Sequence, residues 1–304
     1  MSNRLETIFL GKTLKNNVIT SSGCFGFGDE YSDYFDVNKL GAVNLKGLTL
    51  EKRDGNSGIR IYETPSGMLN CIGLENPGIE YFRDSIITNI KYDTPIIANI
   101  NGSTIEDYIK IGEIVNEIER VDFVELNISC PNVKNGGLAF GVSCESAENV
   151  TSLVKKVLTN KPLIVKLSPN VTDIVSIAKA VENAGANSVS LVNTFLAMKI
   201  DIRKRKPLLG NTFGGLSGEA IRPIAVRMVY QVFKAISIPI IGMGGISNYE
   251  DALEFIMAGA SLVSIGASIF SNPLACIEVI DGINNYLLEN NIDNIKDLVG
   301  VAHL

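Results

Sequence analysis

The chain has 304 residues, and its 27 basic and 33 acidic side chains give a net charge of −6 at neutral pH. This balance argues against binding to nucleic acid or to an anionic membrane, because both favour a basic protein surface. No charged and then apolar leader precedes Glu6, and no apolar run approaches the roughly 20 residues of a membrane span. We therefore expect a cytoplasmic protein without a nucleic-acid or membrane partner.

Cysteine and histidine usage restricts the chemistry further. The five cysteines are odd in number and scattered, which is typical of a reducing compartment. They form no CxxC pair, so we expect neither a zinc ribbon nor an iron–sulfur cluster on this chain. The single histidine, His303, stands next to the C-terminus. A Ser-His-Asp triad or a multi-histidine metal site is thereby excluded, no metal site is predicted, and a general base must be another residue type.

Short β-type runs recur along the chain, and most are followed by apolar residues at helical spacing. Several runs are almost wholly apolar, as expected of parallel strands that are covered on both faces. The predicted strands are Asn17–Ser21, Ala42–Lys46, Pro95–Ile100, Asp122–Ile128, Leu163–Leu167, Ser188–Asn193, Ile238–Met243 and Leu262–Gly266. The predicted helices are Ile105–Ile118, Ser146–Leu158, Ile174–Ala184, Glu219–Ala235 and Tyr249–Met257.

This alternation predicts an α/β fold, a single (β/α)₈ TIM barrel over residues 1–304, since no repeat or linker divides the chain. A doubly wound sheet is the alternative. Two connections, Gly47 to Gly78 and Thr194 to Gly218, are unusually long. Structureless connections of that length are usually functional, and both should leave the C-terminal face of the barrel, where such proteins build their sites. Surface decoration is the other reading of these two segments.

The segment from Glu125 to Gly137 places a cysteine where an apolar strand ends in a loop. Cys130 is flanked by Asn127 and Asn132, so a thiol that can transfer a proton stands among neutral amides. This combination suits an amide-rich ring better than a phosphate or a peptide, although a cysteine packed beside a turn is the alternative. The glycines between Ser129 and Cys144 also predict a loop that closes over a substrate.

Other polar residues stand at the ends of the predicted strands. Lys46 and Lys166 each follow apolar strand residues, and a charge buried there needs an anionic partner. The alternative is that both lysines extend to solvent at the barrel mouth. Asn70, Asn99, Asn127, Asn132 and Asn193 add amides that can donate and accept hydrogen bonds. Glycines in the last two strand ends, 240–246 and 264–268, predict a phosphate site, because backbone N–H groups can approach an anion there.

These motifs resemble those of the dihydroorotate dehydrogenases, over nearly the whole chain. The most specific are Asn70-Cys-Ile-Gly-Leu-Glu-Asn-Pro-Gly78, Asn127-Ile-Ser-Cys-Pro-Asn132, Val192-Asn-Thr194 and Gly214-Gly-Leu-Ser-Gly218. The resemblance implies an FMN-containing barrel that oxidises (S)-dihydroorotate to orotate in pyrimidine biosynthesis. The cysteine in the second motif is similar to the base of class 1 enzymes, and the continuation to Gly141 resembles the NAD⁺-linked class 1B.

The resemblance also implies roles for single residues. Cys130 would take the C5 proton of dihydroorotate while the C6 hydride passes to the flavin. The substrate would be held by Lys46, Asn70, Cys71, Ile72, Gly73, Leu74, Asn127, Asn132, Asn193 and Thr194. The FMN site would be lined by Ser22, Lys46, Gly47, Asn99, Asn127, Lys166, Val192, Gly218, Gly244, Gly245, Gly266 and Ala267. Cys71 and Ala267 depart from the family pattern, where alanine and threonine are commoner.

Electron transfer to NAD⁺ would need cofactors that this chain does not offer. No predicted strand is followed by a GxGxxG helix start, and no cysteine spacing suits an iron–sulfur cluster. Class 1B resemblance implies a second subunit with FAD and a [2Fe–2S] centre, in a heterotetramer of two plus two chains. A fumarate-linked class 1A enzyme, a related dihydropyrimidine dehydrogenase and a phosphate-binding barrel without a redox role are the alternatives.

Overall fold

Eight parallel strands form the centre of the molecule in a computed structural model that describes residues 4–129 and 140–303. The strand order is β3-β16-β15-β10-β9-β8-β7-β4, and a parallel bridge from Ile19 to Ala42 joins the two outer strands. The sheet therefore closes, and the predicted (β/α)₈ barrel is confirmed. The strands are β3 (Val18–Thr20), β4 (Val43–Asn44), β7 (Ile96–Ile100), β8 (Phe123–Asn127), β9 (Leu163–Lys166), β10 (Ser188–Leu191), β15 (Ile240–Met243) and β16 (Leu262–Ile265).

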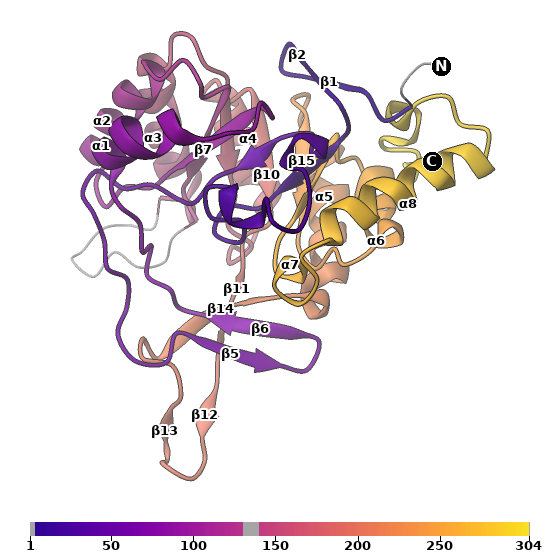
Figure 1. The fold of residues 1–304 in the computed structure, drawn as a ribbon. Helices are drawn as coiled ribbons and strands as arrows, with labels where there is room; N and C mark the ends of the chain where they lie inside the picture. The colour runs from indigo at the N-terminus through magenta and orange to yellow at the C-terminus, as the bar shows by residue number, and fades with distance from the viewer. Residues whose placement is uncertain (1–3, 130–139, 304) are drawn as a thin grey trace.

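Helices surround this barrel (Figure 1). All five predicted helices are present: α2 (Ile105–Asn116), α3 (Cys144–Val157), α4 (Ile174–Asn183), α5 (Arg222–Phe233) and α6 (Tyr249–Met257). Capping boxes explain two starts, since Thr104 and Asn248 each exchange hydrogen bonds with an aspartate three residues later. Helices α1 (Ile79–Tyr81), α7 (Ser268–Ser271) and α8 (Ala275–Glu289) were not predicted.

The barrel interior is apolar at one end and polar at the other. In β8, Val124 and Leu126 face the core shared with the helices, whereas Phe123 packs with residues inside the barrel. Strand alternation then directs Glu125 and Asn127 inward as well. The N-terminal hairpin of β1 (Thr7–Phe9) and β2 (Lys12–Leu14) closes the apolar end, with the Phe9 ring 5.7 Å from that of Phe123. The hairpin thus covers the apolar end, and the polar, C-terminal end is the one that can receive a polar ligand.

The two long connections are not structureless, and in that respect the sequence interpretation was wrong. They pair with each other in a four-stranded antiparallel sheet in the order β11-β14-β6-β5. Its strands are β5 (Ile61–Thr64), β6 (Gly67–Asn70), β11 (Phe195–Met198) and β14 (Phe213–Ser217). Backbone partners that are distant in sequence cannot be recognised from local patterns, which is why this sheet was missed.

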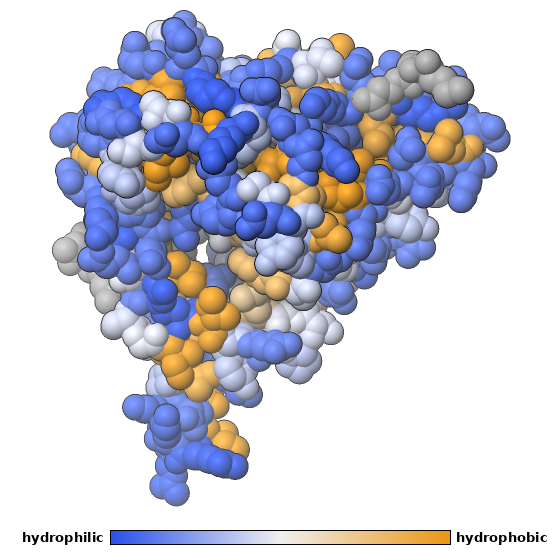
Figure 2. Space-filling model, in the orientation of Figure 1, coloured by the Kyte–Doolittle hydropathy of each residue, from blue (hydrophilic) through white to orange (hydrophobic). Residues whose placement is uncertain are grey.

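A second hairpin, of β12 (Ile200–Asp201) and β13 (Lys206–Pro207), extends from this sheet away from the barrel (Figure 1). The basic run 203–206 lies at its turn and is exposed to solvent. Apolar side chains gather at the base of the projection and hydrophilic ones at its tip (Figure 2). None of the helices within 4–129 and 140–303 has the length and hydrophobicity that a membrane span requires.

Candidate active site

Residues from all eight barrel strands meet at the C-terminal mouth. Each strand contributes at its carboxyl end at least one residue that the sequence predicted to bind cofactor or substrate. These are Ser22 after β3, Lys46 and Gly47 after β4, Asn99 in β7, Asn127 in β8, Lys166 in β9, Val192, Asn193 and Thr194 after β10, Gly244 and Gly245 after β15, and Gly266 and Ala267 after β16. Cys130, Asn132 and most of the predicted closing loop lie outside the described residues.

Lys166 is a nearly buried cation among these strand ends. It ends β9 opposite Asn127 of β8, and the residue is only 5% exposed. No residue in the described ranges forms an ion pair or a hydrogen bond with its ammonium group. A nearly buried charge is costly without a partner, so this position suits an electron-rich ligand.

A second thiol, Cys24, lies beside the same mouth. A Cβ atom placed on Gly266 would lie 3.7 Å from its sulfur. Burial raises the pKa of Cys24 to about 11, although the positive charges of Lys166 and Lys46 act in the opposite direction. This thiol therefore stays protonated at neutral pH and is not a candidate for the base.

Below the mouth lies a buried polar network that the sequence interpretation missed. Glu125 is fully buried, and its carboxyl oxygens accept hydrogen bonds from three strands. The donors are the amides of Asn44 at 2.8 Å and Asn99 at 2.5 Å and the hydroxyl of Ser190 at 2.7 Å. The Asn99 oxygen in turn accepts from Asn101 at 2.7 Å. The orientation of Asn99 at the mouth is thus fixed from both sides. The sequence feature that could have indicated this network is Glu125 itself, a charged residue among the apolar residues of β8.

Replacement of Glu125 by alanine should remove the shared acceptor of this network. Three buried donors would lose their partner, so we expect the free energy of unfolding to fall by about 3 kcal/mol or more. Urea unfolding followed by circular dichroism measures this loss. Glu113 on α2 is exposed, and Glu113→Ala should stay within about 0.5 kcal/mol of the wild type. Equal stability of the two variants would contradict a structural role for the network.

A chain of hydrogen-bonded side chains leads from the end of β10 to Ser129 and Asn127. The Asn193 amide donates to the hydroxyl of Ser129, which donates to the Asn127 oxygen at 2.5 Å. The Asn193 oxygen accepts the Thr194 N–H at 2.8 Å. Ser129 directly precedes Cys130 in the sequence. The described structure therefore brings the predicted amides of two strand ends together immediately before the predicted base.

The predicted substrate segment Asn70–Leu74 begins at the end of a strand of the antiparallel sheet and continues beyond it, and no part of it is on a barrel strand. Asn70 ends β6 and pairs with Gly215 of β14. The Cys71 thiol donates to the Ile59 carbonyl at 3.6 Å and belongs to an apolar cluster with Leu69 and Leu209. Any contact between Cys71 and a ligand at the mouth would therefore come from its backbone.

The glycine turn after β15 lies tightly against its neighbours. Gly245 has a φ of +79°, and a Cβ atom there would come within 2.6 Å of the Gly218 carbonyl oxygen. Gly244 has a φ of +130° and leaves no more room, since its Cβ would lie 2.9 Å from that of Ala225. Only glycine fits both positions, and glycine-rich turns of this kind are the ones that bind anions through backbone N–H groups.

Comparison with known proteins identifies the family. The family model described as Dihydroorotate dehydrogenase matches residues 4–287. A protein of Brachyspira hyodysenteriae named dihydroorotate dehydrogenase B (NAD(+)), catalytic subunit, is 79% identical over 99% of both chains. Proteins with the same name from Desulforamulus reducens and Bacteroides thetaiotaomicron are 55% identical over 95% of both chains and 52% identical over 96% of both chains. The chain belongs to the dihydroorotate dehydrogenase family.

Proposed function

We propose that this protein oxidises (S)-dihydroorotate to orotate in pyrimidine biosynthesis, with FMN in the barrel mouth and NAD⁺ as the final electron acceptor. The family assignment supports the reaction, and the names of the relatives support the link to NAD⁺. The observation that carries the proposal is Lys166, a nearly buried cation at the mouth without a partner among residues 4–129 and 140–303.

The residues present fit a flavin phosphate and ring. The Gly244–Gly245 turn offers backbone N–H groups where a Cβ atom would collide with neighbouring groups. Lys166 would place a positive charge beside the ring edge that gains electrons. Asn99, whose orientation is fixed by Glu125 and Asn101, would present its amide to the same ring. When bound, FMN supplies a two-electron acceptor for the hydride from C6 of the substrate.

The side chains of this protein would complete the reaction. Cys130, as thiolate, would take the C5 proton, so that loss of this proton and of the C6 hydride leaves the C5–C6 double bond of orotate. Lys46 would pair with the substrate carboxylate. The amides of Asn70, Asn127, Asn132 and Asn193, with Thr194, would hydrogen-bond the polar edges of the ring, as amides offer both donors and acceptors. The roles of single residues and the single-domain organisation stay predictions.

A partner subunit would carry the electrons onward. The relatives are named catalytic subunits, which implies that each works with another chain. We assign FAD and a [2Fe–2S] centre to that second chain, in a heterotetramer of two plus two chains in the cytoplasm. The absence of a GxGxxG helix start and of clustered cysteines in this sequence supports the division of labour.

Anaerobic titration of the purified chain tests the proposal. The protein should be yellow with a flavin spectrum, and dihydroorotate should bleach it. Dihydrouracil, which lacks the carboxylate, is the matched control and should bleach it poorly because Lys46 would have no partner. A colourless protein that does not take up FMN would favour a phosphate-binding barrel. Preferential reaction with dihydrouracil would favour a dihydropyrimidine dehydrogenase.

A further inference from the structure

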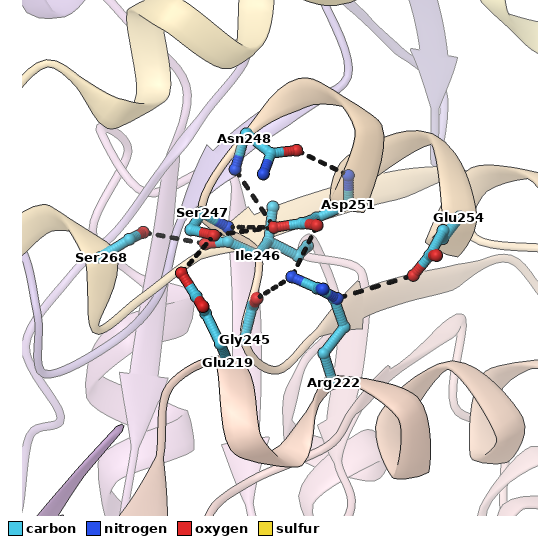
Figure 3. A network of polar contacts seen from close by, with 9 residues as sticks. All are labelled: Glu219, Arg222, Gly245, Ile246, Ser247, Asn248, Asp251, Glu254 and Ser268. Carbon is cyan, nitrogen blue, oxygen red and sulfur yellow. Dashed lines mark hydrogen bonds and ion pairs between the residues drawn. The ribbon is translucent and has the colours of Figure 1, made fainter. Parts of the chain in front are cut away.

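A network of charged side chains lies behind the glycine turn after β15 (Figure 3). Arg222, at the start of α5, contacts Asp251 of α6 through an ion pair of 2.6 Å. Its Nη1 group also lies 3.5 Å from the carbonyl oxygen of Gly245, and its Nε group lies 3.6 Å from Glu254. The guanidinium therefore joins two helices to the turn that lies between them.

Asp251 connects this ion pair to the chain that follows the turn. Its Oδ2 atom accepts the backbone N–H groups of Ser247 at 2.9 Å and Asn248 at 3.3 Å. The Ser247 hydroxyl lies 2.8 Å from the same oxygen and 2.9 Å from Glu219, and its one hydrogen can serve one of them at a time. Asp251 thus fixes the two residues that precede α6, and Glu219 contacts the first of them, Ser247.

The charges and burial of this network indicate whether Arg222 can bind a phosphate directly. The Asp251 side chain is 6% exposed and that of Arg222 is 27% exposed, so solvent screens their interaction only in part. Arg222 faces the carboxylates of Asp251 and Glu254. Arg222 is therefore already neutralised and is a poor counter-charge for a phosphate. Its contacts suit the placement of backbone N–H groups instead.

We propose that Arg222 is a positioning residue for the phosphate end of the flavin. Through Asp251 and the Gly245 carbonyl it holds the Gly244–Gly245 turn in place for the phosphate, and it balances the carboxylates of Asp251 and Glu254, which would otherwise repel a dianion. This inference rests on the proposed function, since it takes FMN as the ligand. The inference predicts a selective effect on affinity. Arg222 should strengthen the binding of FMN but not that of riboflavin, which lacks the phosphate.

The test measures the dissociation constants of FMN and riboflavin for the full-length protein freed of flavin, by quenching of flavin fluorescence. For Arg222→Met we expect the FMN constant to rise about 10- to 100-fold, because charge-assisted hydrogen bonds are lost. The riboflavin constant should change less than about threefold. Arg227 lies on the exposed side of the same helix and bonds Gln231 at 2.7 Å, so Arg227→Met is the matched control and should leave both constants unchanged.

Ser247→Ala is a milder second variant, because it removes one hydroxyl and no charge. It should weaken FMN binding selectively and by less than Arg222→Met. Equal losses for FMN and riboflavin would show a general structural role and overturn the inference, as would unchanged FMN binding in both variants. Wild-type protein that binds neither flavin would overturn the proposed function and this inference with it.

Discussion

Replacement of Cys130 by alanine is expected to lower the rate of flavin reduction by dihydroorotate by roughly 10² to 10⁴, the usual contribution of a positioned general base. The variant should remain yellow, because no predicted FMN contact is removed. Cys130→Ser should also be slow at neutral pH, since a hydroxyl is far less acidic than a thiol. Anaerobic stopped-flow measurement of flavin bleaching gives the rate.

The pH dependence provides an independent check on the same residue. Only the thiolate can accept the C5 proton, and an unperturbed thiol has a pKa of about 8.5. The wild-type rate should therefore rise with pH toward that value and then level off, and the Cys130→Ala rate should not follow this curve. Cys144→Ala is the matched control, because Cys144 is exposed at the start of α3 and should not affect the rate. Wild-type rates in both Cys130 variants would remove this residue from the mechanism.

The isolated chain should reduce its FMN with dihydroorotate and pass the electrons to artificial dyes, but it should reduce NAD⁺ poorly. We infer this because neither a dinucleotide-binding motif nor a cluster-binding cysteine pattern occurs in the sequence. Adding the iron–sulfur flavoprotein subunit should restore NAD⁺ reduction. Formation of NADH is followed by absorbance with dihydroorotate as the electron donor, and dye reduction by the same sample controls for active enzyme.

Two results would contradict this division of labour. Efficient NAD⁺ reduction by the chain alone would remove the need for a partner. Efficient reduction of fumarate by the chain alone would place the protein in the fumarate-linked class 1A. Rapid dye reduction together with slow reduction of both natural acceptors is the outcome that supports class 1B.

The barrel was predictable because each of its strands carries a local signal. Runs such as Leu163–Lys166 are apolar throughout, and helices such as α6 begin with a capping residue. The lysines and amides at the strand ends were also predictable. Topology alone places the carboxyl ends of parallel strands at one mouth, so their spatial proximity followed from the fold.

The missed features depend on contacts between distant residues. Glu125 is one acidic residue in a strand, and its sequence neighbours do not indicate that Asn44 and Ser190 will share its oxygens. Arg222 and Asp251 likewise lie on separate helices. The antiparallel sheet needs the pairing of β6 with β14, which no local periodicity records. Sequence patterns report burial and turns, whereas these features depend on tertiary partners.

The pairing of β6 with β14 has a consequence for the chain during its synthesis. Asn70 and Gly215, which pair in this sheet, are 145 residues apart. At ordinary rates of translation the ribosome needs on the order of 10 seconds to make that stretch. During this time the β5–β6 hairpin has no neighbour for its free edge, and Leu69, buried in the finished protein, lacks the cover that β14 provides. An unpaired edge with apolar side chains is a template for aggregation. The nascent chain therefore depends most on chaperones after β6 has been made and before β14 has been made.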